Sequence, residues 1–253
     1  MTTRILKSTR AGVRVYSGPE ELALKAARSF ARLADQYVLG CGRFTVALSG
    51  GSTPKAMFEA LAAEPFRETV PWGSILFFWG DERTVPADHP DSNYHMAYTT
   101  LLSLVPVPDQ NIFRMPADNP DLEAAAAAYS NTLLGVGDTR EGFPAIDLVF
   151  LGMGADGHTA SLFPGTEALR VTDRVVVPNY VPKLKTHRLT LAVPTINAAR
   201  NVRFLVSGAD KAEPLKSVLE GERDPERYPS QLIHPVDGSL LWMVDEAAAK
   251  LLA

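Results

Sequence analysis

The stretch that decides the fold is Ile146–Gly165, IDLVFLGMGADGHTASLFPG, in which a short apolar run leads directly into a glycine-rich loop. The run Ile146–Leu151 is nearly continuous in apolar residues, which is typical of a strand buried on both faces of a parallel sheet. In open parallel sheets, ligands bind beyond the carboxyl ends of the strands. The loop that starts at Gly152 is therefore the first place to look for a functional site.

Comparable short strands and helical patterns alternate on both sides of this stretch. The alternation predicts an α/β fold, with a Rossmann-like, mostly parallel sheet flanked by helices. We expect one domain over residues 1–253. The further strands are predicted at Val13–Tyr16, Phe44–Leu48, Ile75–Trp79, Arg188–Ala192, Val202–Val206 and Leu240–Val244. The helices are predicted from Ser17 to about Tyr37 and at Pro54–Ala63, Asn93–Leu102, Pro120–Leu134, Ala209–Leu219 and Asp245–Leu252.

Local signals also indicate where two helices begin and where the chain forms a loop. Ser17 with Glu20 resembles a capping box, in which each side chain satisfies a backbone N–H of the first turn. Thr53 is predicted as the N-cap of the next helix, with Pro54 at its first position. The segment Gly221–Pro235 is rich in charge and proline and is predicted as an exposed loop.

Composition limits the classes of function. The formal net charge of −4 argues against nucleic acid as a partner, because binding to a phosphate backbone needs a strongly basic field. The single cysteine, Cys41, excludes an intrachain disulfide and a cysteine-based zinc site. The sequence contains neither an apolar run near Met1 nor the roughly 20 apolar residues of a membrane span. We therefore expect a cytoplasmic protein with no membrane partner.

A glycine-rich turn between the second predicted strand and its helix is a candidate anion site. It consists of Ser49, Gly50, Gly51, Ser52 and Thr53. Backbone N–H groups at a helix start favour negative charge, and the two hydroxyls add donors. A tight turn with an ordinary N-cap is the simpler alternative.

Charged residues follow two other predicted strands. Gly80-Asp81-Glu82-Arg83 comes directly after Trp79, where Arg83 could face an anionic or carbonyl oxygen and Asp81 could orient a neighbour. A solvated loop with an Asp–Arg ion pair would explain the same pattern. Lys211 lies in the first turn of a predicted helix, which the helix dipole disfavours unless an anion is bound nearby. A solvated lysine that covers apolar surface is again the alternative.

The loop after Leu151 contains the pattern G-x-G-x-x-G, which is typical of dinucleotide sites. Such sites need a long helix after the third glycine, and Pro164 with Gly165 prevents one here. The dinucleotide interpretation is therefore rejected, and we expect no cofactor. His158 is the remaining candidate, because histidine is suited to general base catalysis near neutral pH.

Four blocks of the sequence together resemble the 6-phosphogluconolactonase family. They are ALSGGSTPKAMFEAL (Ala47–Leu61), FFWGDERTVPADHPDSNYHMA (Phe77–Ala97), DLVFLGMGADGHTASLFPGT (Asp147–Thr166) and FLVSGADKAEPL (Phe204–Leu215). The resemblance implies a Rossmann-like fold shared with glucosamine-6-phosphate deaminases. It implies hydrolysis of 6-phospho-D-glucono-1,5-lactone to 6-phospho-D-gluconate, the second step of the oxidative pentose phosphate pathway.

The resemblance also implies roles for the candidate residues. His158 would activate water without a metal, and either Asp156 or Asp81 would orient its imidazole, as in a catalytic triad. Lys211, Arg83 and the Ser49–Thr53 loop would hold the phosphate, while loop N–H groups or Arg83 would stabilise the oxyanion. In deaminases the matching block continues Asn-Glu-Pro. This chain has Leu162-Phe163-Pro164, so the deaminase carboxylate is missing.

Three other functions are compatible with parts of the sequence. Ala47–Gly51 approximates the G-x-S-x-G of serine esterases, with Ser49 as nucleophile. A non-catalytic sugar-phosphate sensor could use the same fold, although no output module is recognisable. A metallohydrolase could use Asp81, Asp88, His89 and His95, but the H-E-x-x-H spacing is absent.

Overall fold

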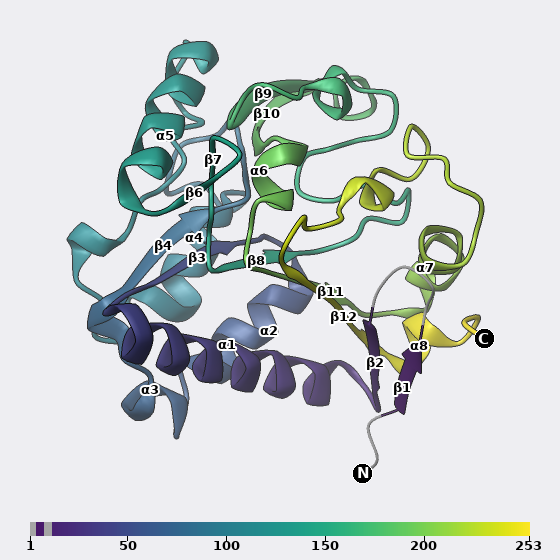
Figure 1. Cartoon of the computed structure of the whole chain (residues 1–253), viewed down its shortest axis with the longest axis horizontal. Coiled ribbons are helices and arrows are strands. Elements are labelled where there is room, and N and C mark those ends of the chain that lie inside the picture. Colours follow the sequence, from purple (N-terminus) through teal and green to yellow (C-terminus); the bar gives the residue numbers. More distant parts are fainter. Residues whose placement is uncertain (1–3, 8–11) are drawn as a thin grey trace.

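The computed structural model describes residues 4–7 and 12–253 and is built around a central sheet (Figure 1). In the described part of the chain this sheet has seven strands in the order β1-β2-β12-β11-β8-β3-β4. Every neighbouring pair is parallel except β1 with β2 at one edge. The predicted Rossmann-like, mostly parallel sheet is therefore confirmed. Its strands are β1 (Arg4–Lys7), β2 (Gly12–Tyr16), β3 (Phe44–Leu48), β4 (Ile75–Trp79), β8 (Leu148–Leu151), β11 (Asn201–Val206) and β12 (Ser239–Asp245).

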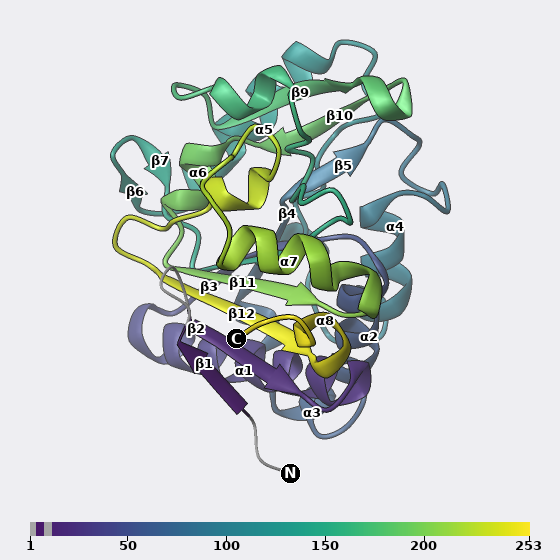
Figure 2. The same cartoon turned by 90° about the vertical axis from the view of Figure 1, so that its right-hand side faces the viewer.

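Helices cover both faces of the sheet, as Figures 1 and 2 show from two sides. On one face lie α1 (Pro19–Cys41), α2 (Ser52–Leu61) and α3 (Phe66–Thr69), and on the other lie α6 (Val193–Asn197) and α7 (Ala212–Leu219). Helix α1 buries Leu22, Ala26, Phe30 and Leu33, whose spacing of three and four residues forms one apolar stripe. Burial of a side chain such as Phe30 stabilises the fold by about 1.5–3 kcal/mol.

The predicted helices are present, with changed ends. The predicted Asn93–Leu102 consists of α4 (Asn93–Ala97) and a π-helical turn, Tyr98–Leu102, and Ala209–Leu219 consists of a 3₁₀ turn, Ala209–Lys211, followed by α7. The others are α5 (Leu122–Val136) and α8 (Glu246–Ala249). Among the described residues, no helix has both the length and the apolar character needed to cross a membrane.

The two predicted helix caps are wrong in detail. Ser17 accepts no bond from the first turn; its N–H and hydroxyl donate to Glu21 Oε2 at 2.9 and 2.8 Å, so Glu21 and not Glu20 is its partner. Helix α2 begins at Ser52 with Gly51 as its N-cap, and Thr53 is already helical. Gly51 has φ +104°, a conformation that glycine reaches more easily than threonine.

A second, antiparallel sheet of three strands was not predicted. It has the order β5-β10-β9, with β5 (Asp81–Arg83), β9 (Val176–Val181) and β10 (Thr186–Leu191). The predicted strand Arg188–Ala192 is therefore real but belongs to this sheet. Gly80–Arg83, predicted as a polar loop, instead links the two sheets, because only Gly80 separates the end of β4 from the start of β5. A two-stranded ribbon, β6 (Thr139–Arg140) with β7 (Phe143–Pro144), completes the strands.

The prediction of an exposed loop at Gly221–Pro235 is wrong for its second half. A 3₁₀ turn covers Pro229–Leu232, and Ser230, Gln231 and Ile233 are buried. Ser230 donates from its backbone N–H and its hydroxyl to Gly157 O, at 3.0 and 2.8 Å. Charge and proline content indicated exposure, but these contacts fix the segment against the loop that carries His158.

Candidate active site

A cavity of about 220 Å³ lies beyond the carboxyl ends of β3, β4, β8 and β11, where the sequence predicted a site. It brings together most of the predicted residues from four separate segments. Those in its lining are Ser49, Gly50, Gly51, Ser52, Asp81, Arg83, His158 and Lys211. Thr53 and Asp156 do not belong to the lining. Residues that the sequence analysis did not single out complete it: Pro54, Asn93, Gly152, Met153, Gly154, Ala160, Leu205, Val206 and Ser207.

His158 is hydrogen-bonded to Asp156, whereas Asp81 is bonded to Ser161. Asp156 Oδ1 lies 2.5 Å from His158 Nδ1 and also accepts the His158 backbone N–H at 3.3 Å. An ionised carboxylate only accepts hydrogen bonds, so Nδ1 carries the proton and Nε2 is left as the acceptor. That tautomer is the one a general base needs.

A lysine outside the cavity lining supports Asp156. Lys183, at the turn between β9 and β10, donates to Asp156 Oδ2 at 2.9 Å. The hydrogen bond with His158 is the largest cause that holds the pKa of Asp156 well below its usual range, and the bond from Lys183 adds to it. No signal in the sequence pointed to Lys183, because its position depends on the turn between β10 and β9, and β9 was not predicted.

Packing fixes the plane of the His158 ring. Phe163 stacks on it with ring centroids 4.0 Å apart and an interplanar angle of 20°. Gly154 lies on another side, where a Cβ atom would come within 2.1 Å of His158 Nδ1. Phe163 stands at the middle position of Leu162-Phe163-Pro164, where the deaminase pattern has its carboxylate. An aromatic contact thus replaces that acid.

Asp81 is bound to a different partner from the one predicted. Its Oδ2 accepts the hydroxyl of Ser161 at 2.7 Å, and its backbone O accepts Asn93 Nδ2 at 2.9 Å. The side chain of Asp81 therefore connects β5 to the segment after His158. Among the described residues, Asp81 forms no hydrogen bond with the imidazole of His158. Asp81 still belongs to the cavity lining.

Glu82 explains why charged residues can follow a buried strand. Its two oxygens accept the backbone N–H groups of Arg83, Asn93 and Tyr94 at 2.7–2.8 Å, and the hydroxyl of Ser92 at 3.1 Å. Burial raises the pKa of Glu82, and these N–H groups oppose the shift. The carboxylate thereby holds the start of α4 against β5 and positions Asn93 at the cavity.

Ser49–Ser52 of the glycine-rich turn line the cavity, and Asn93 leaves no room for a side chain at Gly50. A Cβ atom there would lie 1.8 Å from Asn93 Oδ1. At both Gly50 and Gly154 the close neighbour is a side chain of the protein itself. Gly51 and Ser52 begin α2, whose first N–H groups form the positive end of its dipole.

Two cations lie at the cavity with little neutralisation. Lys211 has one carboxylate partner, Asp210, at 3.0 Å, and 64% of the Asp210 side chain is exposed. Arg83 has no ion pair within the described residues and donates to the backbone O of Asp91. The alternative explanation of Gly80–Arg83, an Asp–Arg ion pair, is therefore not observed among the described residues. Both cations can receive an anion, which agrees with the predicted phosphate site.

The geometry is less suited to the alternative chemistries. The hydroxyl of Ser49 is 3.4 Å from Gly50 O, and no base contacts it among the described residues, so a serine nucleophile lacks its activating partner. In the same part of the chain, no three His, Cys, Asp or Glu side chains group as metal ligands would. Asp81, Asp88, His89 and His95 thus form no such cluster.

Comparisons with known proteins agree with this geometry. The family described as glucosamine-6-phosphate isomerases/6-phosphogluconolactonase matches residues 17–242. A 6-phosphogluconolactonase from Synechocystis is 47% identical over 210 residues, which cover 83% of this chain and 85% of the relative. The solved structure of 6-phosphogluconolactonase from Trypanosoma brucei is 31% identical, with a TM-score of 0.87, and covers 98% of this chain and 100% of that one.

A monomeric glucosamine-6-phosphate deaminase also superposes on the chain. Its TM-score is 0.80 at 24% identity, covering 94% of this chain and 99% of the deaminase. At this identity the likeness shows the shared fold alone. The choice between the two activities of the family has to come from the site.

Proposed function

This chain belongs to the family of glucosamine-6-phosphate isomerases and 6-phosphogluconolactonases, and we propose that it hydrolyses 6-phospho-D-glucono-1,5-lactone to 6-phospho-D-gluconate. The observation that carries the proposal is the His158–Asp156 pair beside a cavity lined by Arg83 and Lys211. A base that could activate water and two cations that could bind a phosphate thus line the same cavity. The 6-phosphogluconolactonase names of the relatives support the same step.

His158 is the proposed general base. Water attacks the lactone carbonyl carbon while Nε2 takes a proton from it, and the electrons of the C=O bond move to the carbonyl oxygen. When the C=O bond reforms, the bond to the ring oxygen breaks, and the imidazolium returns the proton to that oxygen, which becomes a hydroxyl. Asp156 keeps the tautomer and stabilises the charged ring during the step.

The phosphate is assigned to Lys211, Arg83 and the Ser49–Thr53 turn. Lys211 and Arg83 supply charge, and the start of α2 supplies backbone N–H groups and the hydroxyl of Ser52. The oxyanion is assigned to the remaining free N–H groups of the loops. Gly154 and Gly157 are poor candidates, since their N–H groups donate to His158 O and Gly154 O.

The deaminase activity of the family is the second candidate, and the site disfavours it. Ring-opening acid–base chemistry there uses a glutamate, whereas Phe163 stands at this position and stacks on His158. Hydrolysis of a lactone needs no such acid, because a lactone is already an activated ester. Incubation with glucosamine 6-phosphate should therefore release no ammonia.

The proposed reaction uses no metal and takes place in the cytoplasm. A carboxylate-supported histidine suffices to activate water towards an ester carbonyl. Dialysis against a strong chelator should leave the rate unchanged. Activity that disappears and returns only with a divalent cation would contradict this part of the proposal.

The deciding experiment follows the loss of freshly made 6-phosphogluconolactone with and without the protein. The spontaneous rate must be subtracted, because the lactone also opens in water. The expected result is a rate proportional to protein concentration, and no acceleration would refute the proposed function. A serine-directed covalent inactivator should have no effect, which separates this enzyme from a serine esterase.

A further inference from the structure

One face of the second sheet points to the His158 segment. Successive side chains of a strand alternate between faces, so Asp81 and Arg83 share one face of β5, and Arg188 and Thr190 share one face of β10. The register pairs Asp81 with Thr190 and Arg83 with Arg188. Ser161 identifies this face, since its hydroxyl donates to Asp81 and its N–H donates to Thr190 Oγ1 at 3.3 Å.

Arg188 therefore lies directly across from Arg83 on the side of the candidate active site. Cβ atoms of such cross-strand partners are about 4.5–5.5 Å apart, and like charges in that position destabilise a sheet. Neither guanidinium has a carboxylate within 4.0 Å among the described residues; Arg83 donates to Asp91 O and Arg188 to His187 O at 3.3 Å. Burial lowers the pKa of Arg188, and the neighbouring charge of Arg83 lowers it further.

Four other arginines of the chain have carboxylate partners. Arg114, Arg170, Arg174 and Arg200 each have a carboxylate within 4.0 Å. Arg83 and Arg188 are both partly buried, lie opposite each other in the register and have no such partner among the described residues. An anion with two charges and several oxygens would relieve their repulsion and could take hydrogen bonds from both. A phosphate monoester near neutral pH has this chemistry.

We propose that Arg188 is a further substrate-binding residue, which with Arg83 forms a two-guanidinium clamp for the phosphate of the substrate. The inference relies on the proposed function for the identity of the ligand. It adds a binding residue that contributes to recognition of the doubly charged phosphate, beside the single charge of Lys211.

The test compares the wild type with Arg188→Gln and Arg188→Lys, and with Arg170→Gln as a matched control on the surface. Binding of 6-phosphogluconate and of unphosphorylated gluconate is measured by calorimetry, and melting temperatures are recorded with and without 6-phosphogluconate. Arg188→Gln should weaken 6-phosphogluconate binding about tenfold to a hundredfold, as expected for a lost charge-assisted contact, with gluconate binding unchanged.

Melting provides a result that a merely structural arginine would not give. Without ligand, Arg188→Gln should melt at the wild-type temperature or above it, because the like-charge contact is removed; with 6-phosphogluconate its stabilisation should be smaller than that of the wild type. The affinity of Arg188→Lys for 6-phosphogluconate should lie between those of the wild type and Arg188→Gln. Arg170→Gln should bind 6-phosphogluconate as the wild type does. If Arg188→Gln weakens the binding of 6-phosphogluconate but not of gluconate, and the wild type has no lactonase activity, only the proposed function is refuted. Unchanged 6-phosphogluconate binding in an active lactonase would overturn only this inference.

Discussion

The two edges of the central sheet both collect charged side chains, but they use them differently. At the carboxyl edge, Arg83 and Lys211 border a cavity of about 220 Å³ and Arg83 has no carboxylate partner in the described residues. At the amino edge a larger cavity, about 430 Å³, is lined by Arg43, Asp138, Asp147 and Arg200 among others. Size alone would select the second cavity as the active site.

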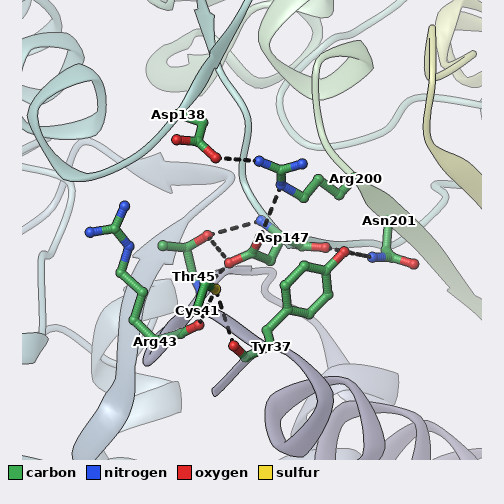
Figure 3. A network of polar contacts seen from close by, with 8 residues as sticks. All are labelled: Tyr37, Cys41, Arg43, Thr45, Asp138, Asp147, Arg200 and Asn201. Carbon is green, nitrogen blue, oxygen red and sulfur yellow. Dashed lines mark hydrogen bonds and ion pairs between the residues drawn. The ribbon is translucent and has the colours of Figure 1, made fainter. Parts of the chain in front are cut away.

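The hydrogen bonds show why the larger cavity is structural in character (Figure 3). Asp147 Oδ2 accepts the N–H and hydroxyl of Thr45 at 2.9 and 2.8 Å, and Oδ1 pairs with Arg200 at 3.2 Å. Arg200 also pairs with Asp138 at 2.6 Å, and Asn201 joins Asp147 O to the hydroxyl of Tyr37. The charges at this edge compensate one another and join β3 to β8. At the carboxyl edge, Arg83 has no such partner among the described residues, and Lys211 has only the exposed Asp210.

The largest expected effect is at the carboxyl edge, in His158→Ala. As the proposed general base, His158 should contribute about 10²–10⁴ in rate, so kcat should fall by that factor. KM should change little, because the phosphate contacts are elsewhere. The measurement is initial rate against lactone concentration, with the spontaneous rate subtracted.

His234→Ala is the matched control, since His234 is exposed and does not belong to the cavity lining. It should keep full activity. The melting temperature of His158→Ala should stay near that of the wild type. A folded His158→Ala protein with nearly normal kcat would disprove the assignment, and the base would then have to be sought at Asp81.

The next effect is expected in Lys211→Ala, which removes a phosphate contact. Loss of a charge-assisted hydrogen bond costs about 1.5–3 kcal/mol, so KM for the phosphorylated lactone should rise roughly tenfold to more than a hundredfold. Lys216→Ala is the control, because Lys216 is exposed on α7. An equal loss on unphosphorylated gluconolactone would show that Lys211 is not a phosphate ligand.

Asp147→Ala should give the opposite pattern and so sharpen the contrast between the edges. It leaves the buried N–H of Thr45 and the guanidinium of Arg200 without this partner, at a cost of about 1–3 kcal/mol in the free energy of unfolding. For a chain of this size that corresponds to a fall of about 2–12 °C in melting temperature. Asp138→Ala, at an exposed position, should have a smaller effect.

Activity separates the two kinds of variant. Asp147→Ala should keep its kcat at temperatures where it is folded. A severe loss of kcat in folded Asp147→Ala, with no loss of stability, would show that the amino edge takes part in function. Charge compensation would then fail to distinguish a structural cavity from an active site.

The sequence predicted the carboxyl edge well because buried strands have a strong local pattern. Phe44–Leu48 and Ile75–Trp79 are observed as predicted, and the segments after them meet as parallel strands require. The second sheet escaped prediction since β5 is short and charged and β9 contains Pro178, a residue that strands usually exclude.

Partners of side chains were harder to predict than positions. The sequence left open whether Asp156 or Asp81 orients His158, and only the folded loop brings Oδ1 of Asp156 to Nδ1. Arg188 and Lys183 were missed for a related reason. The position of Arg188 opposite Arg83 follows only from the pairing of β10 with β5, which joins residues more than a hundred positions apart. The position of Lys183 follows only from the turn between β9 and β10.

The smallest expected effect is in Lys183→Met, which tests how much the outer charge adds to the His158–Asp156 pair. Lys183 is 69% exposed, so its ion pair should contribute only about 0.2–1 kcal/mol. The pKa of Asp156 is lowered in the folded protein, so the stability it contributes is present above the ordinary aspartate pKa and is lost as the pH falls through the lowered value. The difference in melting temperature between wild type and Lys183→Met should therefore be equal at pH 7 and pH 5 and shrink well below pH 4.

The kcat of Lys183→Met should fall less than about fivefold, in line with the same energy. Lys185→Met, two residues along the same turn, should match the wild type in both measurements. A loss of kcat as large as that of His158→Ala would show that Lys183 belongs to the reacting centre and does not merely support Asp156.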